Sequence, residues 1–455
     1  MLGDKPKIHF VGIGGIGMSG IAELLIKQGY NVTGSDLRKT DITEHLREIG
    51  ADIIQGHDSN IVKNADVIVK SSAVRDDNPE IIAAKSNKIP VIRRAEMLSE
   101  IMRMSYGIAV AGTHGKTTTT SLVGMVLQNA DLAPTIIVGG KIMNIGSNNL
   151  LGSGKHIVVE ADEFDRSFLS LTPIIAGITN IEADHLDCYD NLEDIKNAFI
   201  QYANKVPFFG SIVLCLDDHG SQSIIPYLKK RIITYGLSKQ ADIRAENIEM
   251  NEFVSKFDVY YKHNKLTEIE LNIPGHHNIL NSLMAISIGL ELDIPIMTIK
   301  EGLRKFKGVF RRFEFKGKFD KALLYDDYAH HPTEIQATLK GVKENTDKRI
   351  VVVFQPHLYS RTRDFHEEFG KSFFQSDVLI ITPIYPARED PIPGITGKLI
   401  ANDAIQHGHR NVIYIDNNKD IIPKIREIFR ENDIIITMGA GDIYRYGERL
   451  IGKDK

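Results

Sequence analysis

The sequence has few cysteines, no long apolar run and little net charge, and each of these absences excludes a class of protein. Its two cysteines, Cys188 and Cys215, are too few for the disulfide framework of a small secreted domain. No apolar run approaches the length of a membrane span. The net charge of -4, from 55 basic and 59 acidic residues, gives no electrostatic footprint for nucleic acid or a membrane surface.

Targeting segments and repeats are also lacking. Residues 1–7 lead directly into an apolar strand pattern, without the apolar core of a signal peptide, and no internal repeat or heptad run follows. The hydrophobic content of 42% and charged content of 25% are ordinary for a globular protein. These features predict a cytoplasmic protein with no nucleic-acid or membrane partner. At 455 residues the chain is too long for one hydrophobic core, and about three domains are expected.

A glycine-rich turn follows the first strand pattern, Lys7 to Val11. The turn reads Gly12-Ile13-Gly14-Gly15-Ile16-Gly17, and a helix pattern over residues 18–28 comes next. This is G-x-G-x-x-G between a strand and a helix, where the backbone closes on a diphosphate at the helix N-terminus. Asp36, at the end of the next strand pattern, has the spacing of a ribose contact. The turn suits NAD, FAD or any other diphosphate, and a purely structural glycine turn is the alternative.

A second glycine-flanked turn follows the apolar run Ile108 to Ala111. It reads Gly112-Thr113-His114-Gly115-Lys116-Thr117 and leads into another helix pattern. Lys116 can neutralise a β- or γ-phosphate, and the hydroxyl of Thr117 can ligate Mg²⁺. The pattern departs from the general phosphate loop because its outer glycine falls on Val110. It predicts an ATP site, with a glycine turn of no function as the alternative.

Two later strand patterns end in polar residues. Residues 156–160 end at Glu160, and residues 174–179 lead into a segment that contains His185. Ligands of doubly wound sheets bind outside the carboxyl ends of the strands, so we expect both side chains near the Lys116 loop, as ligands of Mg²⁺ or Mn²⁺. We expect the neighbouring carboxylates to be merely solvated: Asp162, Glu163, Asp165 and Asp187.

The remaining sequence contains one more polar helix start and a second α/β region. After short β-like runs over residues 241–271, a helix pattern near Gly275 carries Asn278 and Asn281, which share a face. They are either nucleotide ligands or N-terminal capping residues. Alternating strand and helix patterns begin again after residues 305–312. Buried-strand patterns at 322–325, 350–354, 377–382 and 434–438 predict a parallel sheet.

The two loops are more informative together than separately. The first lacks a lysine and suits a diphosphate that is already attached to a larger molecule, whereas the second suits ATP with Mg²⁺. The last region offers the cations and imidazoles that a small carboxylate-bearing substrate needs: Arg361, Arg363, His330, His331 and His357. This combination predicts activation of a carboxylate by phosphoryl transfer, followed by attack of a nucleophile on the acyl phosphate.

Motifs spread over the whole chain resemble those of the Mur ligase family. They are the Gly112–Thr117 loop, Asn180-Ile181-Glu182 with His185, Gly275-His276-His277-Asn278 with Asn281, and the stretch from Asp326 to Thr333. The resemblance implies an α/β fold of three domains: a Rossmann-like UDP-binding domain (1–98), a central P-loop ATPase-like domain (99–308) and a C-terminal Rossmann-like domain that binds the amino acid (309–455). It implies an ATP-dependent ligase of peptidoglycan precursor synthesis. The reaction joins L-alanine to the lactyl carboxylate of UDP-N-acetylmuramate through an acyl phosphate and releases ADP and phosphate.

The resemblance also implies a role for each matching residue. The UDP-substrate site would contain Gly12, Gly14, Gly15, Gly17, Asp36 and Ser72. The ATP site would contain Gly112, Thr113, His114, Gly115, Lys116, Thr117, Thr118, Asn278, Asn281, Arg312 and Asp327. The ligands of Mg²⁺ or Mn²⁺ would be Thr117, Glu160 and His185, and L-alanine would contact Tyr328, His330 and Arg361.

Four of these residues would act in catalysis: Lys116, Glu160, His185 and His330. The lysine and the metal ligands would relieve the repulsion between the substrate carboxylate and the γ-phosphate. His330 would either deprotonate the alanine amine or position it. Leu358 departs from the family, which often has a basic residue there, so part of the contact to the alanine carboxylate must come from elsewhere, such as Arg361.

Three other functions stay open from the sequence. The nearest is a sister ligase that attaches a recycled tripeptide to the same nucleotide sugar. A nicotinamide-dependent oxidoreductase would use the Gly12–Gly17 turn but would leave the second loop unexplained. A nucleotide-switch protein would hydrolyse ATP without ligating a product.

Overall fold

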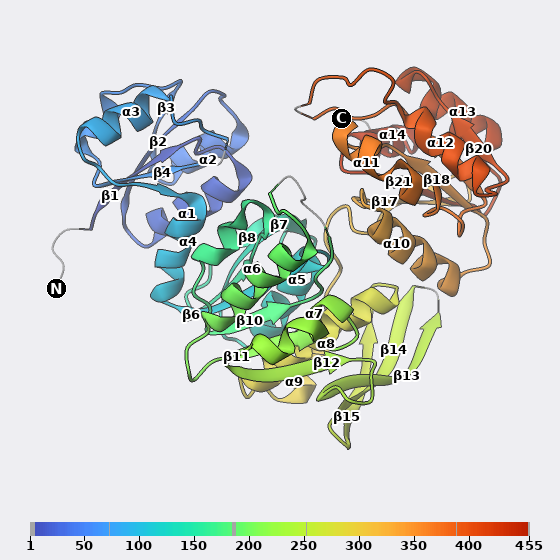
Figure 1. Ribbon diagram of the computed structural model, residues 1–455, viewed down its shortest axis with the longest axis horizontal. Coiled ribbons are helices and arrows are strands. Elements are labelled where there is room, and N and C mark those ends of the chain that lie inside the picture. The colour runs from blue at the N-terminus through green and yellow to red at the C-terminus, as the bar shows by residue number, and fades with distance from the viewer. Residues whose placement is uncertain (1–4, 72, 184–187, 252, 388, 454–455) are drawn as a thin grey trace. The chain divides into compact units, whose positions relative to one another are not determined.

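The computed structural model describes residues 5–71, 73–183, 188–251, 253–387 and 389–453 of an α/β protein with three sheets (Figure 1). Its contacts divide the chain into two compact units. One contains the described residues up to Glu246 together with Asp258–Thr267 and Leu280–Phe306, and the other contains Asn247–Phe257, Glu268–Ile279 and the described residues from Lys307 onwards. Every helix in these described ranges is too short or too polar to cross a bilayer.

The first sheet has five parallel strands in the order β3-β2-β1-β4-β5. Its strands are β1 (Lys7–Val11), β2 (Asn31–Asp36), β3 (Asp52–Gln55), β4 (Val67–Lys70) and β5 (Val91–Arg93). Its helices are α1 (Ile16–Lys27), α2 (Asp41–Glu48), the 3-10 turn η1 (Ile61–Asn64), α3 (Pro79–Ser86) and α4 (Arg94–Arg103). Apolar residues of α1, α2 and α4 cover one face, and those of η1 and α3 cover the other. The Gly12–Gly17 turn joins β1 to α1 and therefore lies at the carboxyl edge of this sheet.

The middle sheet has ten strands in the order β15-β14-β13-β12-β11-β10-β6-β9-β7-β8. They are β6 (Tyr106–Ala111), β7 (Thr135–Ile142), β8 (Ser147–Leu150), β9 (His156–Glu160), β10 (Ile175–Ile178), β11 (Ser211–Cys215), β12 (Arg231–Gly236), β13 (Ile243–Asn251), β14 (Val254–Tyr261) and β15 (Asn264–Leu271). The neighbours from β7 to β13 pair in parallel, and β8 adds an antiparallel edge. Strand β6 lies between β9 and β10, so the ends of these three strands meet at one edge.

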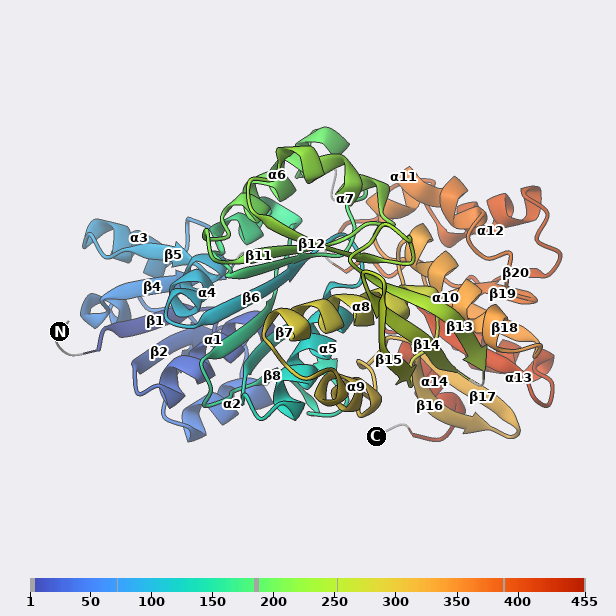
Figure 2. The same ribbon diagram turned by 90° about the horizontal axis from the view of Figure 1, so that it is seen from below.

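Helices cover both faces of the middle sheet (Figure 2). They are α5 (Lys116–Asn129), η2 (Phe164–Ser170), α6 (Leu192–Asn204), α7 (His219–Ile224), η3 (Ile225–Tyr227), α8 (His276–Glu291) and α9 (Ile296–Arg304). On one face Phe168 of η2 packs on Tyr202 of α6, with ring centroids 5.0 Å apart. The buried hydroxyl of Tyr202 donates to the carbonyl of Ala109 in β6 at 2.8 Å. This contact fixes the helix layer against the strand that carries the phosphate loop.

The third sheet has six strands in the order β16-β17-β21-β18-β19-β20. They are β16 (Glu314–Phe319), β17 (Ala322–Asp327), β18 (Ile350–Phe354), β19 (Val378–Ile381), β20 (Val412–Tyr414) and β21 (Ile434–Met438). Its helices are α10 (Pro332–Asn345), α11 (Tyr359–Gly370), α12 (Gly397–Gln406), η4 (Asn418–Asp420), α13 (Ile421–Ile428) and α14 (Ile443–Leu450). Apolar residues of α10, α11 and α12 cover one face, and those of α13 and α14 cover the other. The predicted parallel pairing holds except at β16, which is antiparallel to β17.

The structure confirms most strand patterns and corrects one helix start. Helix α1 begins at Ile16, two residues before the prediction, because the amides of Met18 and Ser19 already bond to the carbonyl of Gly15. Helix α5 begins at Lys116, so the lysine itself occupies the first helical position. The strands of each sheet fall within one of the ranges 1–98, 99–308 and 309–455. The boundaries of these ranges as domains stay predictions.

Candidate active site

The phosphate loop joins β6 to α5 at the carboxyl edge of the middle sheet. Two of its residues have backbone angles that favour glycine: φ is +140° at Gly112 and +81° at Gly115. A Cβ on Gly112 would overlap the hydroxyl of Thr179, and one on Gly115 would lie 2.6 Å from Oδ1 of Asn281. Glycine is therefore required at both positions, because a Cβ would clash with a neighbouring side chain and because other residues disfavour these backbone angles.

The segment after β10 holds this loop in place. The hydroxyl of Thr179 donates to the carbonyl of His114 at 2.6 Å, and Oδ1 of Asn180 accepts the His114 amide at 2.8 Å. The hydroxyl of Thr113 accepts the amide of Glu182 at 2.9 Å. The Asn180-Ile181-Glu182 motif thus supports the loop through the side chain of Asn180 and the backbone amide of Glu182.

Lys116 is enclosed by the loop and by Glu163. Its ammonium donates to the carbonyls of Gly112 at 2.7 Å and Thr113 at 3.2 Å, and it pairs with Oε1 of Glu163 at 2.7 Å. Burial acts to lower the pKa of Lys116, but the charges of Glu163 and Asp162 outweigh this effect and raise the pKa above its ordinary value. The lysine is therefore a firmly charged cation at the N-terminus of α5.

The expectation that Glu163 is merely solvated is wrong. Only 2% of this residue is exposed, and burial raises the pKa of its carboxyl although Lys116 opposes the shift. The chain turns into η2 directly after Asp162 and so directs Glu163 back toward the loop. Asp162 is exposed, as expected. Asp187 lies outside the described residues, as does the side chain of Asp165.

Thr117 and Glu160 place two oxygen donors side by side. The hydroxyl of Thr117 donates to Oε1 of Glu160 at 2.9 Å, and the amide of Gly139 donates to Oε2 at 2.6 Å. A hydroxyl and a carboxylate fit Mg²⁺, which binds through few protein ligands and fills its sphere with water and phosphate oxygens. His185, the third expected ligand, lies outside the described residues. In the part of the chain that is described, no three His, Cys, Asp or Glu side chains gather as a metal site.

The two asparagines of α8 have different surroundings. Oδ1 of Asn281 accepts the hydroxyl of Thr119 at 3.0 Å and lies against Gly115, so this residue is part of the phosphate-loop region. The side chain of Asn278 donates to the carbonyl of Pro274 at 2.7 Å. Because α8 already begins at His276, neither asparagine occupies the N-cap position.

The first glycine turn is organised by Asp36. Its Oδ2 accepts the amide of Gly14 at 2.8 Å, and its Oδ1 accepts the amide of Arg38 at 3.1 Å. Gly12 has φ of +79°, and a Cβ there would lie 3.3 Å from that of Ser71. Ser72, expected in this site, lies outside the described residues. The turn has no charged side chain of its own, so its affinity for a diphosphate would come from backbone amides and neighbouring residues.

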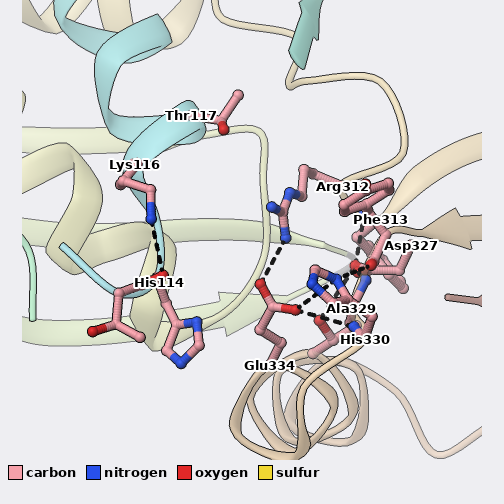
Figure 3. Close-up of polar contacts among 12 residues, drawn as sticks. His114, Lys116, Thr117, Arg312, Phe313, Asp327, Ala329, His330 and Glu334 are labelled. Atoms are coloured by element: carbon pink, nitrogen blue, oxygen red, sulfur yellow. Dashed lines mark hydrogen bonds and ion pairs between the residues drawn. The ribbon is translucent and has the colours of Figure 1, made fainter. Parts of the chain in front are cut away.

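In the second compact unit, Asp327 is a buried anchor (Figure 3). Its carboxylate accepts the amides of Ala329 at 2.7 Å and Phe313 at 2.9 Å. Burial raises the pKa of Asp327 to about 6. These bonds fix the backbone beside Arg312, whose guanidinium pairs with Glu334 at 3.2 Å. Asp327 therefore positions Arg312 by holding the next residue in the chain.

His330 lies between β17 and α10 in the same unit (Figure 3). Its Nδ1 is 3.0 Å from the carbonyl of Tyr328, and a carbonyl only accepts, so we assign the ring proton to Nδ1 and the lone pair to Nε2. Burial lowers the pKa of His330 to about 4, and the charge of Arg361 contributes to this shift. Arg361 has no carboxylate partner among the described residues, whereas Arg363 pairs with Asp364 at 2.7 Å.

Three family models match the chain in succession. They are the Mur ligase family catalytic domain over residues 7–106, the Mur ligase middle domain over 110–289, and the Mur ligase glutamate ligase domain over 311–441. The chain belongs to the Mur ligase family. The family resemblance and the three-domain α/β fold expected from the sequence are therefore confirmed.

Full-length relatives of this Mur ligase chain agree with that assignment. A UDP-N-acetylmuramate–L-alanine ligase of Geotalea daltonii is 52% identical, over 100% of this chain and 99% of the relative. The solved structure of the UDP-N-acetylmuramate–alanine ligase of Thermotoga maritima is 31% identical, with a TM-score of 0.78 over 98% of both chains. A murein peptide ligase of Psychrobacter arcticus is 25% identical, with a TM-score of 0.68 over 98% of both chains.

Two carboxylates of this Mur ligase, one in each compact unit, were not assigned a site role from the sequence. Glu163 neutralises Lys116, and Glu334 contacts both Arg312 and the backbone amide of His330, the latter at 3.0 Å. Glu334 follows His330 by four residues, about one helical turn. This spacing is the one feature of the sequence that could have indicated the contact. Leu358 has φ of +71° and contributes no cation, so positive charge for an alanine carboxylate must come from another residue, such as Arg361 in α11.

Proposed function

We propose that this chain is an ATP-dependent ligase that joins L-alanine to the lactyl carboxylate of UDP-N-acetylmuramate and releases ADP and phosphate. The observation that carries the proposal is a pair of unlike phosphate loops in one compact unit. The loop before α5 holds a buried lysine, and the loop before α1 holds none. The full-length identity of 52% to a ligase of that name supports the same substrates. ATP as the energy source supports the expected cytoplasmic location.

The chemistry follows from charge. A carboxylate that attacks the γ-phosphate brings two anions together, so cations must offset the repulsion. We assign Lys116 to the γ-phosphate, which would take the place of Glu163 beside the ammonium. Thr117 and Glu160 would hold Mg²⁺, which supplies further positive charge to the phosphate oxygens. His185 stays a proposed ligand from the sequence. The acyl phosphate then has a good leaving group for attack by an amine.

The alanine would bind in the second unit, beside His330 and Arg361. Arg361 is assigned to the carboxylate of alanine because it carries a charge without an ion-pair partner in the described ranges. Nε2 of His330 is unprotonated at neutral pH and accepts a hydrogen bond from the amine. A base with a pKa of about 4 gives little driving force for removing a proton, so His330 would mainly hold the amine toward the acyl phosphate.

The tripeptide-attaching ligase is the less favoured alternative. The murein peptide ligase of known structure is 25% identical to this chain, against 31% for the alanine ligase and 52% for the full-length relative. The difference between these activities lies in the size of the incoming amine. The two activities are therefore distinguished by supplying each amine substrate separately in the same assay.

The test is ADP release by the purified enzyme with ATP, Mg²⁺ and UDP-N-acetylmuramate, with L-alanine or a tripeptide added. We expect ADP only when L-alanine is present, and a product heavier than the nucleotide sugar by one alanyl residue in the mass spectrum. ADP release with the tripeptide alone would instead establish the sister activity. ADP release without any amine, and without a ligated product, would contradict both.

A further inference from the structure

Arg311 holds the segment before β16 against the carboxyl edge of the third sheet. Its Nε donates to Oδ2 of Asp326 at 2.9 Å, and its Nη2 donates to the carbonyl of Gly439 at 2.6 Å. Asp326 belongs to β17, and Gly439 directly follows the neighbouring strand β21. The Asp326 side chain is completely buried, and only 20% of the Arg311 side chain is exposed. The guanidinium therefore joins two strands at the edge where His330 lies.

The guanidinium of Arg311 also lies against two tyrosine rings. Its central carbon is 5.0 Å from the ring centroid of Tyr328 and 4.5 Å from that of Tyr444 in α14. A cation within about 6 Å of an aromatic ring is attracted to it, and partial burial strengthens the attraction. Because Asp326 and Gly439 fix the guanidinium, the ring of Tyr328 packs on a surface that is itself held in place.

The backbone of Arg311 makes a further contact with Tyr328. The amide of Tyr328 donates to the carbonyl of Arg311 at 2.5 Å, and the amide of Arg311 donates to Oε2 of Glu314 at 2.9 Å. The φ angle of Arg311 is +59°, a conformation that costs free energy for most residues other than glycine. Contacts of the backbone and the side chain together offset this cost, so they fix the position of Arg311 relative to Tyr328.

Tyr328 in turn contacts His330 in two ways. The two rings pack edge to face, with their centroids 5.2 Å apart. The carbonyl of Tyr328 lies 3.0 Å from Nδ1 of His330, closer than the carboxylate of Glu334, which is 3.4 Å away. Both groups accept hydrogen bonds, so they keep the ring proton on Nδ1 and the lone pair on Nε2. The position of Tyr328 therefore bears directly on the imidazole that we assign to the alanine amine.

We propose that Arg311 is a positioning residue of the amine site, which acts through Tyr328 to orient the imidazole of His330. This inference rests on the proposed function and deepens it. Arg312 also lies near the ring of Tyr328, at 5.5 Å, but it pairs with Glu334 and is expected in the ATP site. The partners of Arg311 belong to the protein itself, so Arg311 holds the ring whether or not a nucleotide is bound.

The test compares Arg311→Lys with Arg426→Lys. Lysine keeps the charge beside Asp326 but loses the planar fork that bonds to Gly439 and packs on the rings. Arg426 is the matched control, because it is an exposed arginine 6.0 Å from the ring of Phe319 in the same compact unit. Steady-state ADP release is measured with L-alanine, ATP and UDP-N-acetylmuramate varied in turn.

We expect Arg311→Lys to raise KM for L-alanine by about five- to tenfold and to leave KM for ATP and for UDP-N-acetylmuramate unchanged. Tyr444→Leu should raise KM for L-alanine by about threefold, because Arg311 loses one of its two rings. Tyr444→Phe keeps that ring and should behave as the unsubstituted enzyme does. Arg426→Lys should change none of these constants.

A double-mutant cycle with His330→Gln separates positioning from a general loss of structure. This substitution removes the imidazole, so Arg311→Lys should have little further effect on KM for L-alanine in that background. Urea unfolding is measured on the same proteins. Any loss of stability from Arg311→Lys should be equal in the two backgrounds, because the contact with Asp326 does not involve His330.

Three results would overturn the assignment. One is an unchanged KM for L-alanine in Arg311→Lys. The second is an equal rise of this KM in both backgrounds, which would show that Arg311 does not act through His330. The third is a parallel rise of KM for all three substrates, which would make Arg311 a structural residue only. If the unsubstituted enzyme released no ADP with L-alanine, the proposed function itself would be contradicted.

Discussion

Lys116 and Glu163 form a buried ion pair, with Nζ and Oε1 2.7 Å apart, at the first turn of α5. The same ammonium is held by two carbonyls of its own loop. The positive charge of the phosphate loop is therefore compensated by the protein before any nucleotide binds. A γ-phosphate would compete with Glu163 for Lys116, so the site exchanges one anionic partner for another.

Lys116→Ala should abolish ADP release while leaving binding of UDP-N-acetylmuramate measurable, because the diphosphate is expected at a different loop. Lys27→Ala removes an exposed lysine that pairs with Glu23 on the same helix, and it serves as the control. The two measurements are coupled ADP detection and calorimetry with the nucleotide sugar. Surviving ADP formation would remove the central assignment of the site.

Glu163→Gln should destabilise the nucleotide-free enzyme, because it removes a buried partner of Lys116 while keeping the size of the side chain. Breaking a buried pair costs about 3 kcal/mol. Saturating Mg²⁺ and ATP should reduce the difference from the unsubstituted enzyme, since the phosphate replaces the lost carboxylate. Urea unfolding with and without nucleotide measures both quantities. An unchanged difference would show that the phosphate does not take over the position of Glu163.

Gly115→Ala should weaken ATP binding by at least about tenfold. The new Cβ would meet Oδ1 of Asn281 at 2.6 Å, and alanine at φ of +81° adds strain of about 1–2 kcal/mol. Gly146→Ala is the control, because its φ is +70° but its Cβ would meet nothing within 4 Å. Equal ATP affinity of the two variants would show that the contact with Asn281 does not matter.

Arg361→Lys should raise KM for L-alanine by about tenfold with little change in KM for ATP, because lysine keeps the charge but loses the fork that binds a carboxylate. Arg363→Lys, two residues later, changes an exposed arginine that pairs with Asp364, and it should leave both constants unchanged. Steady-state kinetics with each substrate varied in turn measures the effects. Equal behaviour of the two variants would exclude the contact between Arg361 and alanine.

Acid should destabilise the second unit through His277. Burial, together with the charge of Arg312, lowers the pKa of His277 from 6.5 to about 4. The unfolded chain therefore binds a proton between these values that the folded chain does not bind. The contribution of His277 to stability is complete above pH 6.5 and is lost as the pH falls toward 4, by up to about 3 kcal/mol.

Unfolding free energies at pH 7.5 and 5 for the unsubstituted enzyme and His277→Gln measure this contribution. The loss of stability on acidification should be smaller in the variant. His45→Gln is the control, because half of that side chain is exposed (53%). An identical acid loss in the His277 variant and the unsubstituted enzyme would contradict the buried, neutral imidazole.

The strands that carry the site could be predicted because buried parallel strands are continuous apolar runs. The patterns at Lys7–Val11, His156–Glu160, Ile350–Phe354 and Ile434–Met438 match the observed strands. The β7–β8 hairpin and the antiparallel edge strand β16 could not be predicted in this way. They are partly exposed, and their pairing depends on the neighbouring strand more than on their own pattern.

The sequence by itself determined the chemistry of the two loops. Glycines at fixed spacing, and a lysine followed by threonine at a helix start, are local requirements of phosphate binding, so they are legible without the fold. The tertiary structure alone decided which charged and polar groups lie in contact. It buried Glu163 against Lys116 and directed Asp36 to the amide of Gly14. Such pairings join residues that are far apart in the chain, and burial makes each of them strong, so neither follows from a local pattern.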